Sequence, residues 1–84
     1  MDNKEETLAD LKSILGNMGI EILFAINEGA IDIETIKIFS GLPLSCVKGR
    51  IPVLLDLNLI KESPKGFSLT ERGIRIKTEL KSKV

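Results

Sequence analysis

Glycine and proline interrupt the apolar pattern of this chain at four places, and these interruptions limit the length that any helix or strand can reach. They are Gly16 with Gly19, Gly29, the run Ser-Gly-Leu-Pro at 40–43, and the run Pro-Lys-Gly at 64–66. No apolar run approaches the roughly 18 residues that a membrane-spanning helix needs. We therefore expect one small domain over residues 1–84, with no membrane-spanning segment.

Apolar residues recur every three or four positions in the segment before Gly29 and in the segment before residues 40–43. This spacing predicts helices. The first segment is expected as two helical pieces, over about 3–15 and 19–28, because an interior glycine costs about 1 kcal/mol relative to alanine. A further helix should begin after Asp32, which is a good N-cap residue. The residues expected on its inward side are Ile33, Ile36 and Phe39.

The next helix is predicted from about Pro43 to Leu57, and Asn58 can adopt the left-handed conformation that ends it. From residue 60 the period changes to two, which predicts two short strands around the turn at 64–66. Thr70 then caps a last helix over about 71–82. The fold class expected is mainly α with a small β-hairpin (α+β), in the order helix, helix, helix, hairpin, helix.

The formal net charge is zero, but the charges are unevenly distributed along the sequence. Residues 1–36 hold two basic and eight acidic residues, a net charge of −6, whereas residues 37–84 hold ten basic and four acidic residues, a net charge of +6. An asymmetry of this kind between two halves indicates a side that faces a polyanion.

Several classes of protein are disfavoured by the composition. With one cysteine and no histidine, the chain lacks the ligands for a zinc site and the residues for a Cys/His nucleophilic pair, so we expect no metal, no cofactor and no enzymatic activity. The acidic N-terminus is unlike a signal peptide, and the lone cysteine suits a reducing compartment, so a cytoplasmic location is expected. The absence of Gln, His and Trp resembles the bias of heat-adapted proteins.

Two helices joined by a tight turn and followed by a hairpin have the pattern of a winged helix-turn-helix. Residues 42–60, LPLSCVKGRIPVLLDLNLI, resemble the second helix of that motif in small bacterial and archaeal winged-helix transcriptional regulators. Residues 66–73, GFSLTERG, are similar to the wing strand and the following helix start of the same proteins. The resemblance covers about residues 19–80.

The resemblance implies a transcriptional regulator that binds double-stranded DNA through the helix at about 43–57 and the wing at about 60–69. The inward face of the recognition helix would be Val47, Ile51 and Leu54. The implied DNA-binding residues are Ser45, Cys46, Lys48, Arg50, Lys61 and Lys65. Regulators of this size usually pair two recognition helices, so a homodimer is expected through the N-terminal extension, residues 1–18, or through the last helix.

Other residues depart from the family pattern and support an alternative. Pro52 lies inside the recognition helix, where it removes a backbone hydrogen bond or forces a kink. Ile38, Leu44 and Leu55 occupy positions where the family usually has polar residues, and they are interpreted as local core packing or as a patch for a protein partner. The alternative is a winged helix used as a protein-interaction module. Cys46 is either a small residue in a Ser/Thr position or a redox-sensitive thiol.

Overall fold

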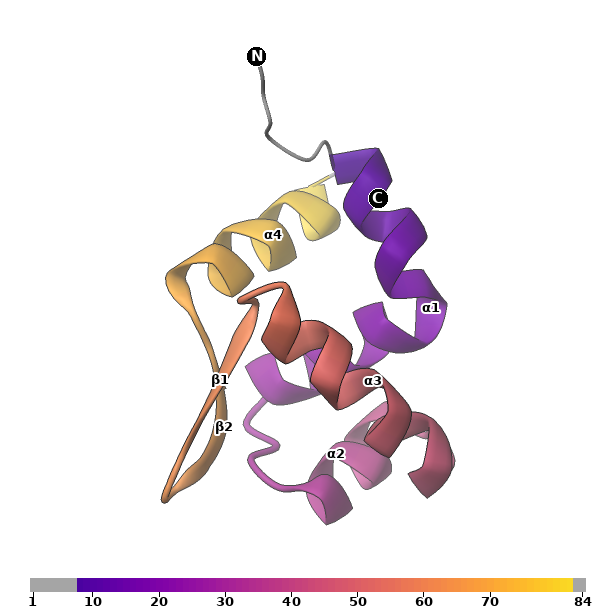
Figure 1. Ribbon diagram of the computed structural model, residues 1–84, viewed down its shortest axis with the longest axis vertical. Helices are drawn as coiled ribbons and strands as arrows, with labels where there is room; N and C mark the ends of the chain where they lie inside the picture. The colour runs from indigo at the N-terminus through magenta and orange to yellow at the C-terminus, as the bar shows by residue number, and fades with distance from the viewer. Residues whose placement is uncertain (1–7, 83–84) are drawn as a thin grey trace.

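The computed structural model describes residues 8–82 as four helices and one antiparallel hairpin (Figure 1). The elements are α1 (Leu8–Asn27), α2 (Ile33–Ser40), α3 (Leu44–Asp56), β1 (Ile60–Ser63), β2 (Gly66–Leu69) and α4 (Glu71–Ser82). This order confirms the expected α+β class and is compatible with a winged helix. The part of the expected first helix and of the N-terminal extension that falls on residues 1–7 lies outside the described residues.

The helix α1 bends at Gly16, where the expected break between two helical pieces is found. Gly16 has φ 67° and ψ 175°, a conformation that side chains with a Cβ rarely adopt. Gly19, by contrast, continues the helix and is buried. The first half of α1 lies beside α4 at one end of the molecule, and the second half passes behind α3 (Figure 1).

The helix α2 begins at Asp32, as expected, with a capping box. The Asp32 carboxylate accepts a hydrogen bond from the Thr35 N–H at 2.8 Å, and the Asp32 N–H donates to the Thr35 hydroxyl at 3.2 Å. Gly41, in the left-handed conformation at φ 75°, ends the helix. Three residues, Gly41 to Pro43, then lead into α3, and the two helices meet at 109°, an angle typical of a helix-turn-helix.

One expectation for α2 is wrong. Ile36 is buried and Ile33 is half-buried, but Phe39 is 52% exposed. At about 100° per residue, Ile33 and Phe39 lie about 60° to either side of Ile36, so they point about 120° apart. The core lies on the Ile33 side, and Phe39 therefore faces solvent.

The core is formed by aliphatic residues from every helix and from the hairpin, together with Phe67 of β2. It contains no buried polar side chain among the residues described. Val47, Ile51 and Leu54 of α3 are buried, which confirms the predicted inward face of that helix. They pack with Ile22 and Leu23 of α1 in one continuous cluster. The helix α3 continues through Pro52, whose ring is exposed.

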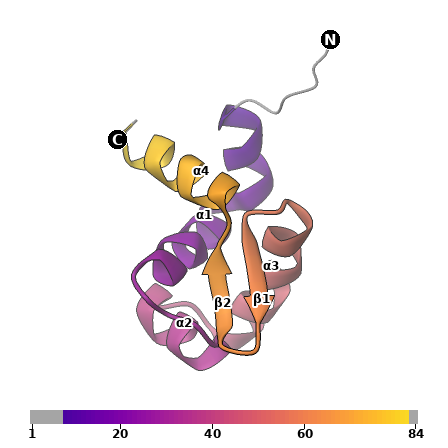
Figure 2. The same cartoon turned by 90° about the vertical axis from the view of Figure 1, so that its left-hand side faces the viewer.

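The hairpin has the predicted position and packs against the connection between α1 and α2 (Figure 2). Ser63 pairs with Gly66, so Pro64 and Lys65 form a two-residue turn. The Phe67 N–H of β2 donates to the Ile31 carbonyl at 2.8 Å. A Cβ at Gly66 would collide with the same carbonyl oxygen, so this close approach requires glycine.

Thr70 joins the end of α3 to the start of α4. Its hydroxyl donates to the Asn58 carbonyl at 2.6 Å and accepts from the Gly73 N–H at 3.0 Å, which confirms it as the cap of the last helix. Asn58 has the expected left-handed conformation, with φ 60°. The Thr70 N–H donates to the Leu59 carbonyl at 3.1 Å.

The contact between Gly73 and Leu59 leads to a stability prediction. A Cβ at Gly73 would collide with the Leu59 carbonyl oxygen, whereas a Cβ at Gly49, also in a helix, would meet no atom within 4 Å. We expect Gly73→Ala to lower the free energy of unfolding by about 2 kcal/mol. Gly49→Ala should raise it by about 0.5–1 kcal/mol, because alanine restricts the unfolded chain. Urea unfolding of both variants measures the two changes in the free energy of unfolding. Equal changes would contradict the close contact between Gly73 and the Leu59 carbonyl oxygen.

The capping box predicts how stability depends on pH. Hydrogen bonds from the side chain and then the backbone of Thr35 lower the pKa of Asp32 below its ordinary value. The ionised form is thus favoured by folding, and its contribution is present at neutral pH and lost as the pH falls below about 4. Asp32→Asn should therefore be less stable than the natural chain at pH ~7, with the difference shrinking toward pH ~3. Urea unfolding at both pH values tests this, and a difference independent of pH would contradict it.

Candidate nucleic-acid interface

The outward side of α3 is exposed, and it is the candidate surface for contact with a groove of nucleic acid. Because Val47, Ile51 and Leu54 point inward, Ser45 and Lys48 are exposed in the first half of the helix. Gly49 and Pro52 are exposed on the same side. The N-terminal half of a recognition helix is the part that reaches base edges.

This side of α3 carries mostly small side chains. Ser45 has a short hydroxyl, and Gly49 and Pro52 offer no hydrogen-bonding side chain, so Lys48 is the long polar side chain there. A backbone can approach a partner closely over such a surface, but few side chains can form bidentate contacts with bases. The chemistry of the surface therefore suits phosphate and shape contacts more than direct reading of sequence.

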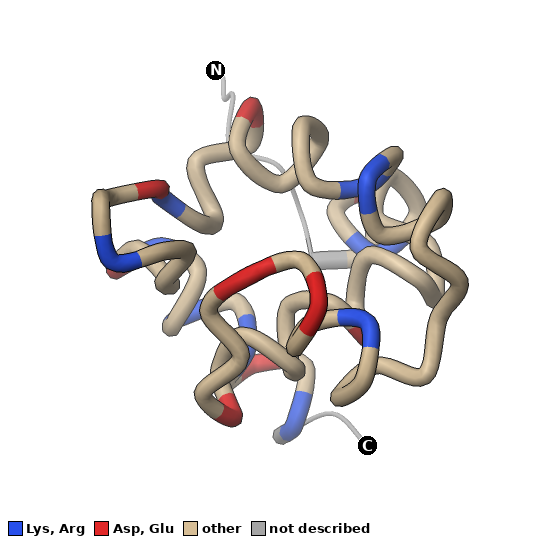
Figure 3. Tube along the Cα trace, turned by 90° about the horizontal axis from the view of Figure 1, so that it is seen from below, with Lys and Arg blue, Asp and Glu red and all other residues tan. Residues whose placement is uncertain are grey.

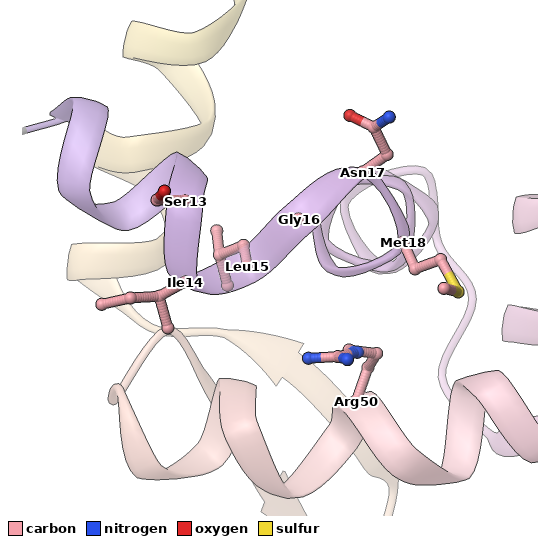
Figure 4. A pocket seen from close by; sticks show the side chains of 7 residues that line it. All are labelled: Ser13, Ile14, Leu15, Gly16, Asn17, Met18 and Arg50. Carbon is pink, nitrogen blue, oxygen red and sulfur yellow. The ribbon is translucent and has the colours of Figure 1, made fainter.

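Cys46 and Arg50 lie on the flank of α3 rather than on its outward side. Both are half-buried. Arg50 and Lys48 are two positions apart, which turns their side chains about 200° from one another around the helix. Arg50 extends toward the bend of α1 and lines a cleft with residues 13–18 (Figure 4). The structure thus does not bring Arg50 together with Lys48.

The two wing lysines are exposed on the hairpin. Lys61 lies in β1 opposite Ser68, and Lys65 lies in the turn, where its N–H donates to the Ser63 hydroxyl at 3.2 Å. The tip of the hairpin and the start of α3 lie at the same end of the molecule, with α2 between them (Figure 1). Lys48 and Lys65 therefore belong to elements that share one end of the fold.

The positive half of the sequence does not form one continuous face. Within residues 37–82, its basic residues lie either on α2, α3 and the hairpin, or on α4, which lies at the opposite end beside the first half of α1 (Figure 1). Seen from the α2 end, acidic segments lie among the basic ones (Figure 3). Asp32 and Glu34 are exposed at the start of α2. The charge separation along the sequence therefore overstates the separation in space.

The described part of the chain, residues 8–82, holds no group of three His, Cys, Asp or Glu side chains that could bind a metal ion. In the same residues, no single helix has both the length and the apolar character to cross a membrane, and α2 with α3 meets that criterion only as a pair bent by 109°.

No family model matches the chain, and no curated protein matches it. The resemblance to winged-helix regulators therefore rests on the residues quoted above and on the arrangement of four helices and a hairpin.

Proposed function

We propose that this chain is a DNA-binding winged-helix protein that acts in transcription regulation, with α3 as the recognition helix and the hairpin as the wing. The observation that carries the proposal is the geometry of α2 and α3. They are joined by three residues, meet at 109°, and leave Ser45, Lys48 and Gly49 exposed on the outward side of the first half of α3. This geometry is the one that places a second helix in the major groove.

Each proposed contact follows from the position of its side chain. Lys48, near the start of α3, contacts phosphate or a base edge, and Ser45 donates a hydrogen bond that positions the helix. Lys61 and Lys65 contact phosphates beside the wing. Cys46 and Arg50 are secondary candidates, because both are half-buried on the flank.

A homodimer remains part of the proposal. An apolar stripe on α1 includes Leu11, Leu15 and Met18, which recur every three or four positions. Leu11 and Leu15 are buried within their own chain, while Met18 is 39% exposed. Ile14 on α1 is 46% exposed and Ile74 on α4 is 49% exposed. These three exposed residues, rather than the whole stripe, are available for contact with a second copy.

The proposal predicts weak, salt-sensitive binding to duplex DNA. With three lysine–phosphate contacts and a slope of about −0.9 each, affinity should fall about 40-fold between about 50 and 200 mM salt. Replacing Lys48, Lys61 and Lys65 together by Gln should weaken binding and reduce the magnitude of the slope by about 2.7. Fluorescence anisotropy with a labelled random duplex measures both quantities.

A matched control is available at the other end of the molecule. Lys12, Arg75 and Lys81 are exposed on α1 and α4, and their joint replacement by Gln removes the same formal charge. This variant should keep most of the affinity. Absence of binding at low salt, or equal losses in the two triple variants, would overturn the proposed interface.

A second candidate function, a protein-interaction module, is favoured by the exposure of α2. Ile38 is 71% exposed and neighbouring Phe39 is 52% exposed, an unusual display of apolar surface. Leu44 is half-buried, and Leu55 is half-buried and packs against the core. Of the three residues proposed for a protein partner, Ile38 is therefore the most exposed, while Leu44 and Leu55 are half-buried.

Ile38→Asp distinguishes the two candidates. The side chain is exposed, so the free energy of unfolding should change by less than about 0.5 kcal/mol. If the chain acts through DNA, the variant should bind duplex with nearly unchanged affinity, because Ile38 is outside the proposed contact set. Loss of a co-purifying protein from the variant, together with no DNA binding by the natural chain, would instead favour the interaction module.

A further inference from the structure

The bend of α1 creates a cleft beside α3 that the three proposed lysine contacts, Lys48, Lys61 and Lys65, do not line. It has a volume of about 320 Å³ and is lined by Ser13, Ile14, Leu15, Gly16, Asn17, Met18 and Arg50 (Figure 4). Six of these residues come from the bend itself and one comes from α3. The cleft therefore exists because Gly16 interrupts the helix.

Arg50 gives the cleft its charge. Of the described residues that line it, Arg50 alone is charged. Its side chain extends from α3 toward the bend at Gly16, while the Asn17 amide points away from it (Figure 4). The guanidinium is half-buried, and none of the residues that line the cleft carries a carboxylate to pair with it. Partial burial without a counter-ion has a cost in free energy, which an anionic group in the cleft would offset.

The rest of the lining is suited to an apolar group. Ile14 and Met18 are 46% and 39% exposed, and they lie on opposite sides of Arg50 (Figure 4). Covering either side chain with a short aliphatic chain would remove apolar surface from water. The helical segment that restarts after Gly16 also places an N-terminal end at the cleft, and such an end favours negative charge.

We propose that this cleft binds a small amphipathic carboxylate. The carboxylate pairs with the Arg50 guanidinium, which matches its planar two-oxygen geometry, and a short aliphatic tail lies against Ile14 or Met18, which flank Arg50 on its two sides (Figure 4). Because Arg50 belongs to α3 and the other lining residues belong to α1, the bound molecule bridges the two helices. Arg50 is also a secondary candidate for a DNA contact, and Ile14 and Met18 are also candidates for contact with a second copy, so a bound carboxylate would compete with both. The measurement below is made without DNA, so its failure does not depend on whether the chain binds DNA.

Hexanoate is a suitable probe, with hexanol and hexylammonium as matched molecules of the same chain length. In an NMR titration of the uniformly labelled chain, hexanoate should shift the amide signals of residues 13–18 and 50, with a dissociation constant in the range of about 1 mM. Hexanol should bind at least about fivefold more weakly, and hexylammonium should not bind at the cleft. Equal binding of hexanoate and hexanol would overturn the proposal.

Variants test the two parts of the cleft separately. Arg50→Gln should weaken hexanoate binding about tenfold or more, and Arg50→Lys should weaken it less, because the charge remains but the planar fork is lost. Lys12→Gln removes one positive charge from an exposed position of α1 outside the lining and should have no more than a small effect.

A second variant, Ile14→Glu, tests the cleft even if the Arg50 variants do not fold. Ile14 is exposed, so Ile14→Glu should fold, and its carboxylate beside Arg50 should weaken hexanoate binding at least fivefold. The dispersion of the amide signals reports whether each variant is folded. Binding by folded Arg50→Gln as tight as that by the natural chain would overturn the assignment of Arg50.

Discussion

The junction of residues 58 and 59 with Thr70 is the contact on which the second half of the fold depends. Asn58 turns the chain at the end of α3, and its carbonyl and that of Leu59 accept hydrogen bonds from the side chain and backbone of Thr70. The same threonine caps α4. One residue thus closes the base of the hairpin and starts the last helix, which fixes the hairpin relative to α3.

The elements that the sequence predicted well are those decided by local chemistry. Several helix ends are fixed by hydrogen bonds or backbone conformations that need no distant partner. The residues at these ends are Asp32 with Thr35, Gly41, Asn58 and Thr70. The inward face of α3 followed from its spacing in the same way. These helix ends can be predicted from the sequence because the local interactions form in the same way wherever the segment lies in the fold.

The features that the sequence did not predict depend on distant contacts. Phe39 was expected inside, but the position of the core relative to α2 is decided by α1 and α3. Helical spacing places Arg50 on the flank of α3, as the structure has it, but does not show that its side chain extends toward the bend of α1 (Figure 4). The positive half of the chain is divided between two ends of the molecule, because α4 folds back onto α1. Nothing local in the sequence signals the cleft, which needs both the bend at Gly16 and the approach of α3.

The hydrogen bond from Phe67 to the Ile31 carbonyl has a consequence for how the hairpin meets other molecules. A two-stranded sheet has two edges at which a further strand could add. The β2 edge is covered at Phe67 by the connection between α1 and α2. The β1 edge carries exposed Lys61 and Glu62, and charged side chains of this kind oppose strand addition. The wing is thereby protected on both sides against growing into a larger sheet with other copies.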